Sequence, residues 1–239
     1  MNWPGGSCFA PESLLDDRGR RIFWAWVLDQ RKGKGVVTRE LGVMTLPRML
    51  LLDPHGRLRI ESPEELESLR HNHRRMEGLF VAPDQEMRLD DIEGDVIELM
   101  LEASVPAGGL FGLKVRVAPD SAEQTIITVD TSTNTLSIDT TRSSMNPKIF
   151  QRYPITRGDE GQDVRIHTAP FGLGSGEPLR LRIFLDKSIL EVYANRRQCV
   201  TQRIYPTRED SLGLVLFSSG GTTRVDSIDA WNMACCNTD

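Results

Sequence analysis

The residues of this sequence most able to carry out chemistry are carboxylates that lie next to an aromatic strand. Glu12 precedes a segment in which Trp24 and Trp26 are two residues apart, so both indoles share one face of a strand. Paired carboxylates hydrolyse glycosidic bonds, and aromatic faces stack on the C–H surfaces of sugars. With Trp3 and Phe9, these side chains predict either a sugar platform or packed aromatic core, and we favour the core.

Signatures of other enzyme classes are absent from the sequence. It contains no phosphate loop, no dinucleotide-binding glycine pattern, no His-Glu-x-x-His and no Gly-x-Ser-x-Gly. We interpret His71 and His73 as solvent-facing and His167 as a structural hydrogen-bonding residue. No cysteine pair has the spacing of a zinc site. We therefore expect no metal, no cofactor and no nucleophilic catalysis.

The net charge and hydropathy of the sequence limit the kinds of partner that the chain can bind. The 239 residues carry a formal net charge of −5, which argues against nucleic acid or an anionic membrane as a partner. No apolar run is long enough to span a membrane, and the first twenty residues lack the pattern of a signal peptide. The localisation stays open, with the cytoplasm as the default expectation.

The first sixty residues read as a small antiparallel sheet. Strands are predicted at 20–28, 43–52 and 57–60, with Pro47 interrupting the second. The Asp-Pro-His-Gly sequence at 53–56 is typical of a tight turn between the last two. These segments predict three strands of one small antiparallel sheet.

A short helix is predicted to follow as a linker. Ser62 can cap its N-terminus, Pro63 suits the first helical position, and Glu65 completes a capping box. Leu66 and Leu69 then fall on one face. The basic residues after them are interpreted as a solvated surface.

From about residue 78 the pattern changes to short strands with a period of two. Apolar residues alternate with polar ones at 111–117 and again at 179–185. Turn signals separate further runs at 95–104, 124–130, 134–140, 189–194, 198–204, 212–218 and 223–231. About nine strands at this spacing predict an all-β, two-sheet antiparallel β-sandwich.

The order of these segments resembles glycoside hydrolase family 32, the invertases and other β-fructosidases. Five blocks carry the resemblance in the order of the family, and the first two are residues 8–13 (Cys-Phe-Ala-Pro-Glu-Ser) and 19–26 (Gly-Arg-Arg-Ile-Phe-Trp-Ala-Trp). The others are Leu-Pro-Arg at 46–48 with Leu-Asp-Pro-His-Gly at 52–56, Pro-Glu-Glu-Leu-Glu-Ser-Leu-Arg at 63–70, and residues 181–193 followed by Arg-Ile-Tyr-Pro at 203–206.

The resemblance implies a fold in two parts. Family members have a five-bladed β-propeller with the active site, then a linker and a C-terminal β-sandwich. Accordingly, residues 1–60 are expected to form a partial propeller blade, 61–77 a linker helix, and 78–239 the sandwich.

The resemblance also implies hydrolysis of fructosides, but by residues that this sequence lacks. The family uses an aspartate in Asn-Asp-Pro-Asn-Gly, an Arg-Asp-Pro aspartate and a Glu-Cys acid/base, and none of these motifs is present. Since a retaining glycosidase needs both carboxylates, we assign no catalytic residue and expect the chain alone to be inactive. Sucrose, inulin and levan remain open as substrates of the intact protein.

Some site residues carry over from the family pattern. Sugar contacts of the last blade match Phe9, Glu12, Trp24 and Trp26, although Phe9 lacks a tyrosine hydroxyl and Glu12 replaces a neutral or basic residue. In the sandwich motif, Asp186 and Ser188 are expected in a turn, and Glu191 is expected to pair with a basic group across the domain interface; all three are given a structural role.

Three hypotheses follow for the function of the chain. It is the non-catalytic C-terminal part of a β-fructosidase, with an N-terminal propeller chain or a second copy covering its exposed apolar surface. Alternatively, it is a free carbohydrate-binding module for a fructoside or another glycan. The third hypothesis is a purely structural or oligomerisation module. We favour the first.

Overall fold

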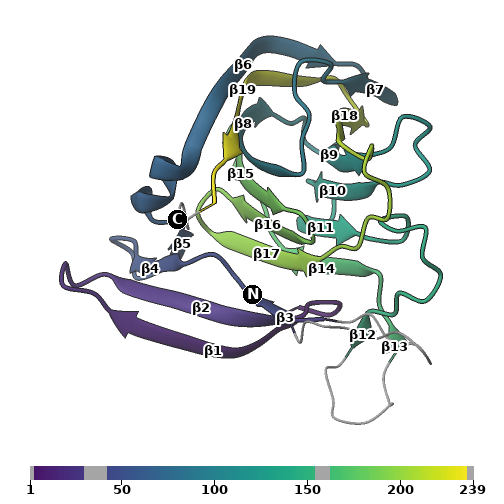
Figure 1. The fold of residues 1–239 in the computed structure, drawn as a ribbon. Helices are drawn as coiled ribbons and strands as arrows, with labels where there is room; N and C mark the ends of the chain where they lie inside the picture. Colours follow the sequence, from purple (N-terminus) through teal and green to yellow (C-terminus); the bar gives the residue numbers. More distant parts are fainter. Residues whose placement is uncertain (1–2, 30–41, 154–161, 236–239) are drawn as a thin grey trace.

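The computed structural model describes residues 3–29, 42–153 and 162–235, which fold into two parts (Figure 1). Residues near the N-terminus form one antiparallel sheet, and the rest form two six-stranded antiparallel sheets. This architecture confirms the all-β sandwich class that the alternating patterns predict.

The first part, named here the N-terminal sheet, is antiparallel as predicted and gains one strand, β1, that the sequence analysis does not predict. Its strands are β1 (Cys8–Leu15), β2 (Arg21–Leu28), β4 (Arg48–Leu52) and β5 (Leu58–Glu61), hydrogen-bonded in that order, with β3 (Gly42–Met44) beside the end of β2. Tight turns set this order because aspartate side chains cap the backbone amides. Asp16 accepts from the amides of Arg18 and Arg20, and Asp53 does the same for His55 and Arg57.

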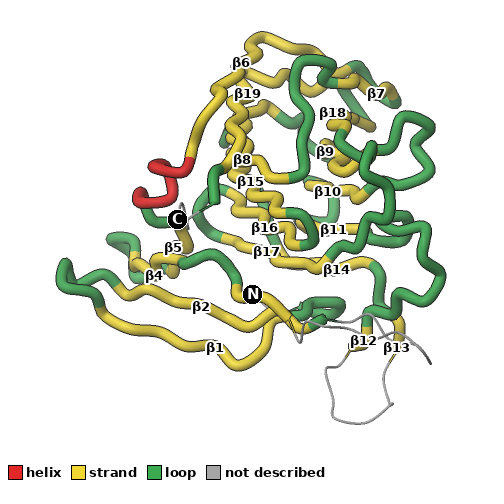
Figure 2. The backbone as a smooth tube through the Cα atoms, in the orientation of Figure 1, coloured by secondary structure: helices red, strands yellow, loops and turns green. Residues whose placement is uncertain are grey.

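The linker differs from the predicted helix over 61–77. Figure 2 shows a single short helix between β5 and β6, the six-residue 3-10 helix Glu64–Leu69, which no side chain caps. Glu65 accepts hydrogen bonds from the Arg20 guanidinium instead of closing a capping box. From Arg70 the chain is strand β6 (Arg70–Val81), because pairing with the last strand of the sandwich satisfies its backbone along almost its whole length. The first sandwich strand therefore begins at Arg70, before residue 78.

The sandwich consists of two sheets whose inner faces form one core. The first sheet contains, in order, β14 (Ile166–Pro170), β11 (Thr135–Asp139), β10 (Thr125–Asp130), β9 (Leu110–Val117), β18 (Gly213–Ser219) and β7 (Gln85–Arg88). The second contains β17 (Gln198–Arg203), β16 (Ile189–Ala194), β15 (Leu179–Asp186), β8 (Val96–Ser104), β19 (Thr223–Met233) and β6. A two-stranded ribbon of β12 (Arg152–Tyr153) and β13 (Gln162–Asp163) lies outside both.

The predicted alternation matches the core. Phe111, Leu113 and Val115 on β9 and Leu181 and Ile183 on β15 are all buried within one apolar cluster. Burying these side chains between two sheets supplies the main stabilisation of the sandwich.

The N-terminal sheet packs against the sandwich at β16 and β17 (Figure 1). A smaller apolar cluster joins Ile60 and Leu66 to Phe184, Tyr193 and Cys199 of the sandwich. One backbone hydrogen bond, from the Ile60 amide to the Arg196 carbonyl at 2.8 Å, crosses the same boundary. The two parts therefore share a packed junction.

Candidate functional site at the junction of the two parts

The four residues expected to contact sugar lie on one face of the N-terminal sheet. Phe9 pairs with Trp26, and Glu12 pairs with Trp24, so each pair projects to the same side. Glu12 follows Phe9 by three positions, an odd spacing that in a regular strand would place the two side chains on opposite faces. A bulge at Ala10, whose φ is 43°, absorbs the extra residue. We name this surface the aromatic face.

The aromatic face is exposed, yet it is not a flat platform. The rings of Phe9 and Trp26 meet edge to face, with centroids 6.4 Å apart and an interplanar angle of 63°. Phe9 is 49% exposed, whereas both tryptophans are half-buried. Trp3 does not join them; it packs against the sandwich core, and its indole Nε1 donates to Gln198. A stacking platform requires coplanar rings, and the rings of Phe9 and Trp26 are not coplanar.

The opposite face of the N-terminal sheet carries a buried ion pair with the sandwich. Arg48 of β4 lies 2.7 Å from Oε2 of Glu191 on β16, and the two side chains are 0% and 1% exposed. The other carboxylate oxygen accepts from the backbone amide of Leu46 at 2.6 Å. Arg48 also donates to the hydroxyl of Thr201. The sequence assigns Glu191 a cationic partner across the interface, and the structure places Arg48 there.

Burial shapes the electrostatics of this pair. Burial, reinforced by the Glu191 carboxylate, holds the pKa of Tyr193 well above its usual value. The phenol therefore stays protonated and donates to Oε2 of Glu191 at 3.4 Å. Arg48, the Leu46 amide and Tyr193 therefore all donate hydrogen bonds to this one buried carboxylate.

The other residues of the sandwich motif lie apart from this pair. Asp186 ends β15 and is exposed, and Ser188 follows in the two-residue turn to β16. Ser188 therefore occupies the predicted turn, and Asp186 is the strand residue directly before it. The structure therefore separates the motif into a turn and one buried carboxylate.

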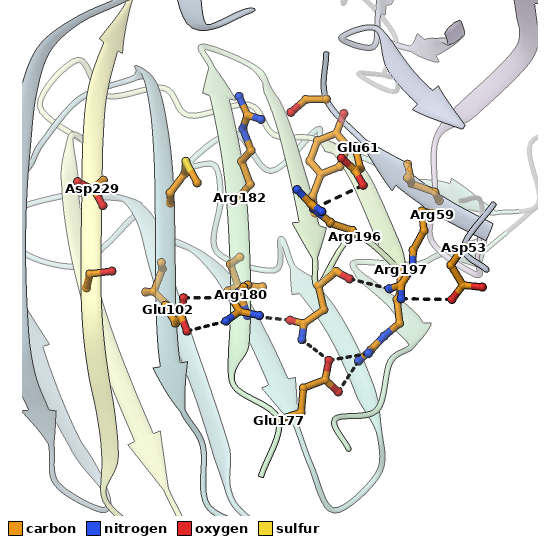
Figure 3. Close-up of a pocket in the computed structure, with 18 residues that line it drawn as sticks. Asp53, Arg59, Glu61, Glu102, Glu177, Arg180, Arg182, Arg196, Arg197 and Asp229 are labelled. Carbon is orange, nitrogen blue, oxygen red and sulfur yellow. Dashed lines mark hydrogen bonds and ion pairs between the residues drawn. The ribbon is translucent and has the colours of Figure 1, made fainter. Parts of the chain in front are cut away.

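A groove of about 800 Å³ lies beside the junction, between β5 and the outer surface of the sandwich sheet (Figure 3). Its charged side chains are five arginines and five carboxylates: Arg59, Arg180, Arg182, Arg196 and Arg197 with Asp53, Glu61, Glu102, Glu177 and Asp229. We name it the junction groove.

The charges of the junction groove neutralise one another. Arg197 lies 2.6 Å from Glu177, and Arg180 lies 2.9 Å from Glu102. Arg59 and Arg196 pair with Asp53 and Glu61 at 3.3 and 3.5 Å. Carboxylates held by arginines are poor general acids because their protonated form is disfavoured. The groove is therefore rich in hydrogen-bonding groups and suits a polar, uncharged ligand.

The Glu177 carboxylate is expected to make the stability of the fold depend on pH. Burial alone would raise its pKa, but hydrogen bonds from Arg197, the Gly174 amide and Asn195 lower the pKa from 4.5 to about 2. A carboxylate with a lowered pKa stabilises the fold above its unfolded pKa and loses that contribution as the pH falls.

We therefore expect Glu177→Gln to lower the free energy of unfolding at pH 7. The difference between wild type and variant should shrink as the pH falls from 4.5 towards 2. Urea denaturation across this range measures it, and a difference that stays constant would contradict the assignment.

Sequence reasoning missed several residues of the junction. Arg48 belongs to a block that the sequence analysis quotes, yet nothing local marks it as the partner of Glu191, 143 positions away. Arg197 and Glu177 carry no motif at all. Among the described residues there is no cluster of three or more potential metal ligands and no helix long and apolar enough to cross a membrane.

Known relatives match this chain along almost its whole length. Fructan 6-exohydrolase of Beta vulgaris is 24% identical over 274 residues, a match that spans 98% of this chain and 43% of the relative. Sucrose-6-phosphate hydrolase of Zymomonas mobilis is 26% identical over 242 residues, again 98% of this chain and 43% of the relative. The chain thus spans less than half the length of the curated relatives it matches.

Solved structures and a family description agree with these matches. The crystal structure of fructan 1-exohydrolase IIa from Cichorium intybus has a TM-score of 0.79 at 21% identity, covering 98% of this chain and 49% of that one, which shows the same fold. Residues 65–232 match the family described as "Glycosyl hydrolases family 32 C terminal". The chain therefore belongs to glycosyl hydrolase family 32 and carries the C-terminal domain of that family.

Proposed function

We propose that this chain is the non-catalytic C-terminal part of a β-fructosidase, an enzyme that hydrolyses fructosides such as sucrose or fructans. Relatives named as fructan and sucrose-6-phosphate hydrolases, about twice as long as the match, support this activity for the complete protein. The proposal assigns the hydrolytic chemistry to an N-terminal propeller and the docking surface to this chain.

The N-terminal sheet is proposed as most of the last propeller blade, over residues 1–60. Its meander of four strands suits a blade, and the 3-10 helix then serves as the linker to the sandwich. In this arrangement the aromatic face is the surface on which a neighbouring blade packs, and Phe9, Glu12, Trp24 and Trp26 lie close to the fructoside.

The single observation that carries the proposal is the exposure of the aromatic face. Phe9, Leu14 and Met44 lie on it and are 49%, 48% and 53% exposed. Large apolar side chains gathered on one face are typical of a surface that another protein surface covers. The opposite face already docks on the sandwich through the pair of Arg48 and Glu191.

The chain alone is proposed to be inactive. The sequence lacks the three catalytic motifs of the family, and all five carboxylates of the junction groove are paired with arginines. Without two free carboxylates facing one glycosidic bond, retaining hydrolysis has no acid and no nucleophile.

Hydrolysis assays test the proposal directly. The purified chain is incubated with sucrose, inulin and levan, with and without the polypeptide encoded immediately upstream. We expect release of fructose only in the mixture. Activity of the chain alone would overturn the proposal, and so would inactivity of a mixture in which the two polypeptides bind each other.

A second candidate function, carbohydrate binding without catalysis, rests on the junction groove. Its volume suits an oligosaccharide, and its paired charges leave many donors and acceptors but little net charge. Arg180→Ala should weaken binding of a kestose or inulin oligomer in calorimetry. Arg224→Ala is the matched control, because both arginines are ion-paired and similarly exposed, at 60% and 57%. No binding, together with self-association, would favour a structural or oligomerisation module instead.

A further inference from the structure

A second cavity, of about 280 Å³, opens at the end of the sandwich where the turn between β15 and β16 meets β9 and the segment after β17. Eight residues line it: Arg116, Asn146, Ile149, Lys187, Ser188, Tyr205, Pro206 and Thr207. We name it the Arg116 pocket. Ser188 and Tyr205 belong to the two segments, 181–193 and 203–206, of the last sequence block.

The lining of the Arg116 pocket differs in charge from that of the junction groove. It includes two cations, Arg116 and Lys187, and no carboxylate. Its other polar side chains are an amide, two aliphatic hydroxyls and a phenol, all of which can donate hydrogen bonds. A pocket that offers donors and positive charge favours a ligand that accepts hydrogen bonds and carries negative charge.

Arg116 is held in the pocket by an unusual backbone. Its φ is +52°, a backbone conformation that residues other than glycine rarely adopt. The register shifts here: Gly213 pairs with Val117 and Val215 with Lys114, so β9 carries one residue more than β18. Such a bulge redirects side chains at the end of a sheet, and strained backbone gathers at functional sites.

The guanidinium of Arg116 is buried and incompletely paired. Only 6% of the residue is exposed, and among the described residues its Nε has no hydrogen-bond acceptor. Nη1 lies 2.9 Å from Oδ2 of Asp95, and the Lys187 ammonium lies 2.8 Å from the same oxygen. A single oxygen of Asp95 is therefore shared by two cations, and the Asp186 carboxylate lies close enough to interact with Lys187 as well.

A third cation lies against the ring of Tyr205, one of the residues that line the pocket. The Arg203 guanidinium lies over the Tyr205 ring, 5.4 Å from its centroid, and Arg203 is 1% exposed. A cation against the ring makes the phenol a stronger hydrogen-bond donor. Tyr205 thus places a polarised phenol ring in the wall of the pocket.

We propose that the Arg116 pocket binds a phosphate group, either as inorganic phosphate or as the monoester of a hexose. Guanidinium and ammonium donors are the usual partners of phosphate oxygens. The volume of about 280 Å³ accommodates a monosaccharide as well as the phosphate. This site goes beyond the proposed function, because it lies in the sandwich and requires no propeller.

Calorimetric titration of the full chain tests the proposal with inorganic phosphate and with fructose 6-phosphate as separate probes. Ionic strength is held constant with sodium chloride. We expect Arg116→Gln to weaken binding about tenfold or more and Lys187→Gln to weaken it several-fold, because each removes a charge-assisted hydrogen bond. Tighter binding of fructose 6-phosphate than of phosphate would identify the ester as the ligand, and equal binding would identify the free anion.

Two further variants keep the result interpretable if Arg116→Gln disturbs the fold. Tyr205→Phe retains the ring beneath Arg203 and removes only the hydroxyl, so it should weaken binding without unfolding the chain. Arg224→Gln, on the exposed surface of β19, is the control and should bind as wild type does. Absence of binding by both probes, or binding that Lys187→Gln and Tyr205→Phe leave unchanged, would overturn the proposal.

Discussion

Replacing Arg48 with methionine is expected to lower the free energy of unfolding by about 3–5 kcal/mol, the usual cost of leaving a buried charge without its partner. Glu191 is 1% exposed, so water cannot replace the guanidinium. The Leu46 amide and the Tyr193 hydroxyl would still donate to the carboxylate, but neither carries a compensating charge. Urea denaturation followed by tryptophan fluorescence measures the loss.

A second substitution separates charge from packing. The double variant Arg48→Met, Glu191→Leu removes both ions, and we expect it to regain most of the stability because apolar replacements of buried pairs are often well tolerated. Arg224→Met is the matched control: its exposed pair with Asp226 should contribute less than about 1 kcal/mol. A loss for Arg48→Met no larger than for this control would show that the pair does not stabilise the junction.

Alternation of apolar and polar residues made most of the fold predictable. The strands at β9 and β15 follow a period of two, and a half-buried sheet requires that period. The linker was predicted less well because a favourable capping sequence is a local signal. The pairing of β6 with β19 is a tertiary one, and it outweighs local propensity from Arg70 onward.

The candidate sites were predictable only where neighbours in sequence also meet in space. Trp24 and Trp26 share a face for that reason, but the bulge at Ala10 that brings Phe9 and Glu12 to the same face has no clear sequence signature. Arg48 and Glu191 meet across 143 positions. Long-range pairs of this kind depend on how the two parts dock, which single-sequence patterns do not encode.

Replacing Leu14 with glutamate is expected to prevent the upstream polypeptide from restoring fructoside hydrolysis. Leu14 pairs with Ile22 and is 48% exposed on the aromatic face, where the proposal places a neighbouring blade. A carboxylate buried there without a partner would be strongly disfavoured. We expect the two polypeptides to bind about thirtyfold or more weakly, the loss typical of a central interface residue.

Phe80→Glu provides the comparison that makes this result specific. Phe80 is also a large apolar residue, 61% exposed, but it lies on edge strand β6 of the sandwich. If the aromatic face is the docking surface, Leu14→Glu weakens association and Phe80→Glu does not, while both variants keep the stability of wild type. Equal losses in the two variants would point to nonspecific apolar association, and loss only in Phe80→Glu would place the partner on the sandwich. Because Leu14 lies two positions from Glu12 on the same face, activity lost together with association reports assembly of the propeller, and activity lost while association is kept would indicate damage to the fructoside site.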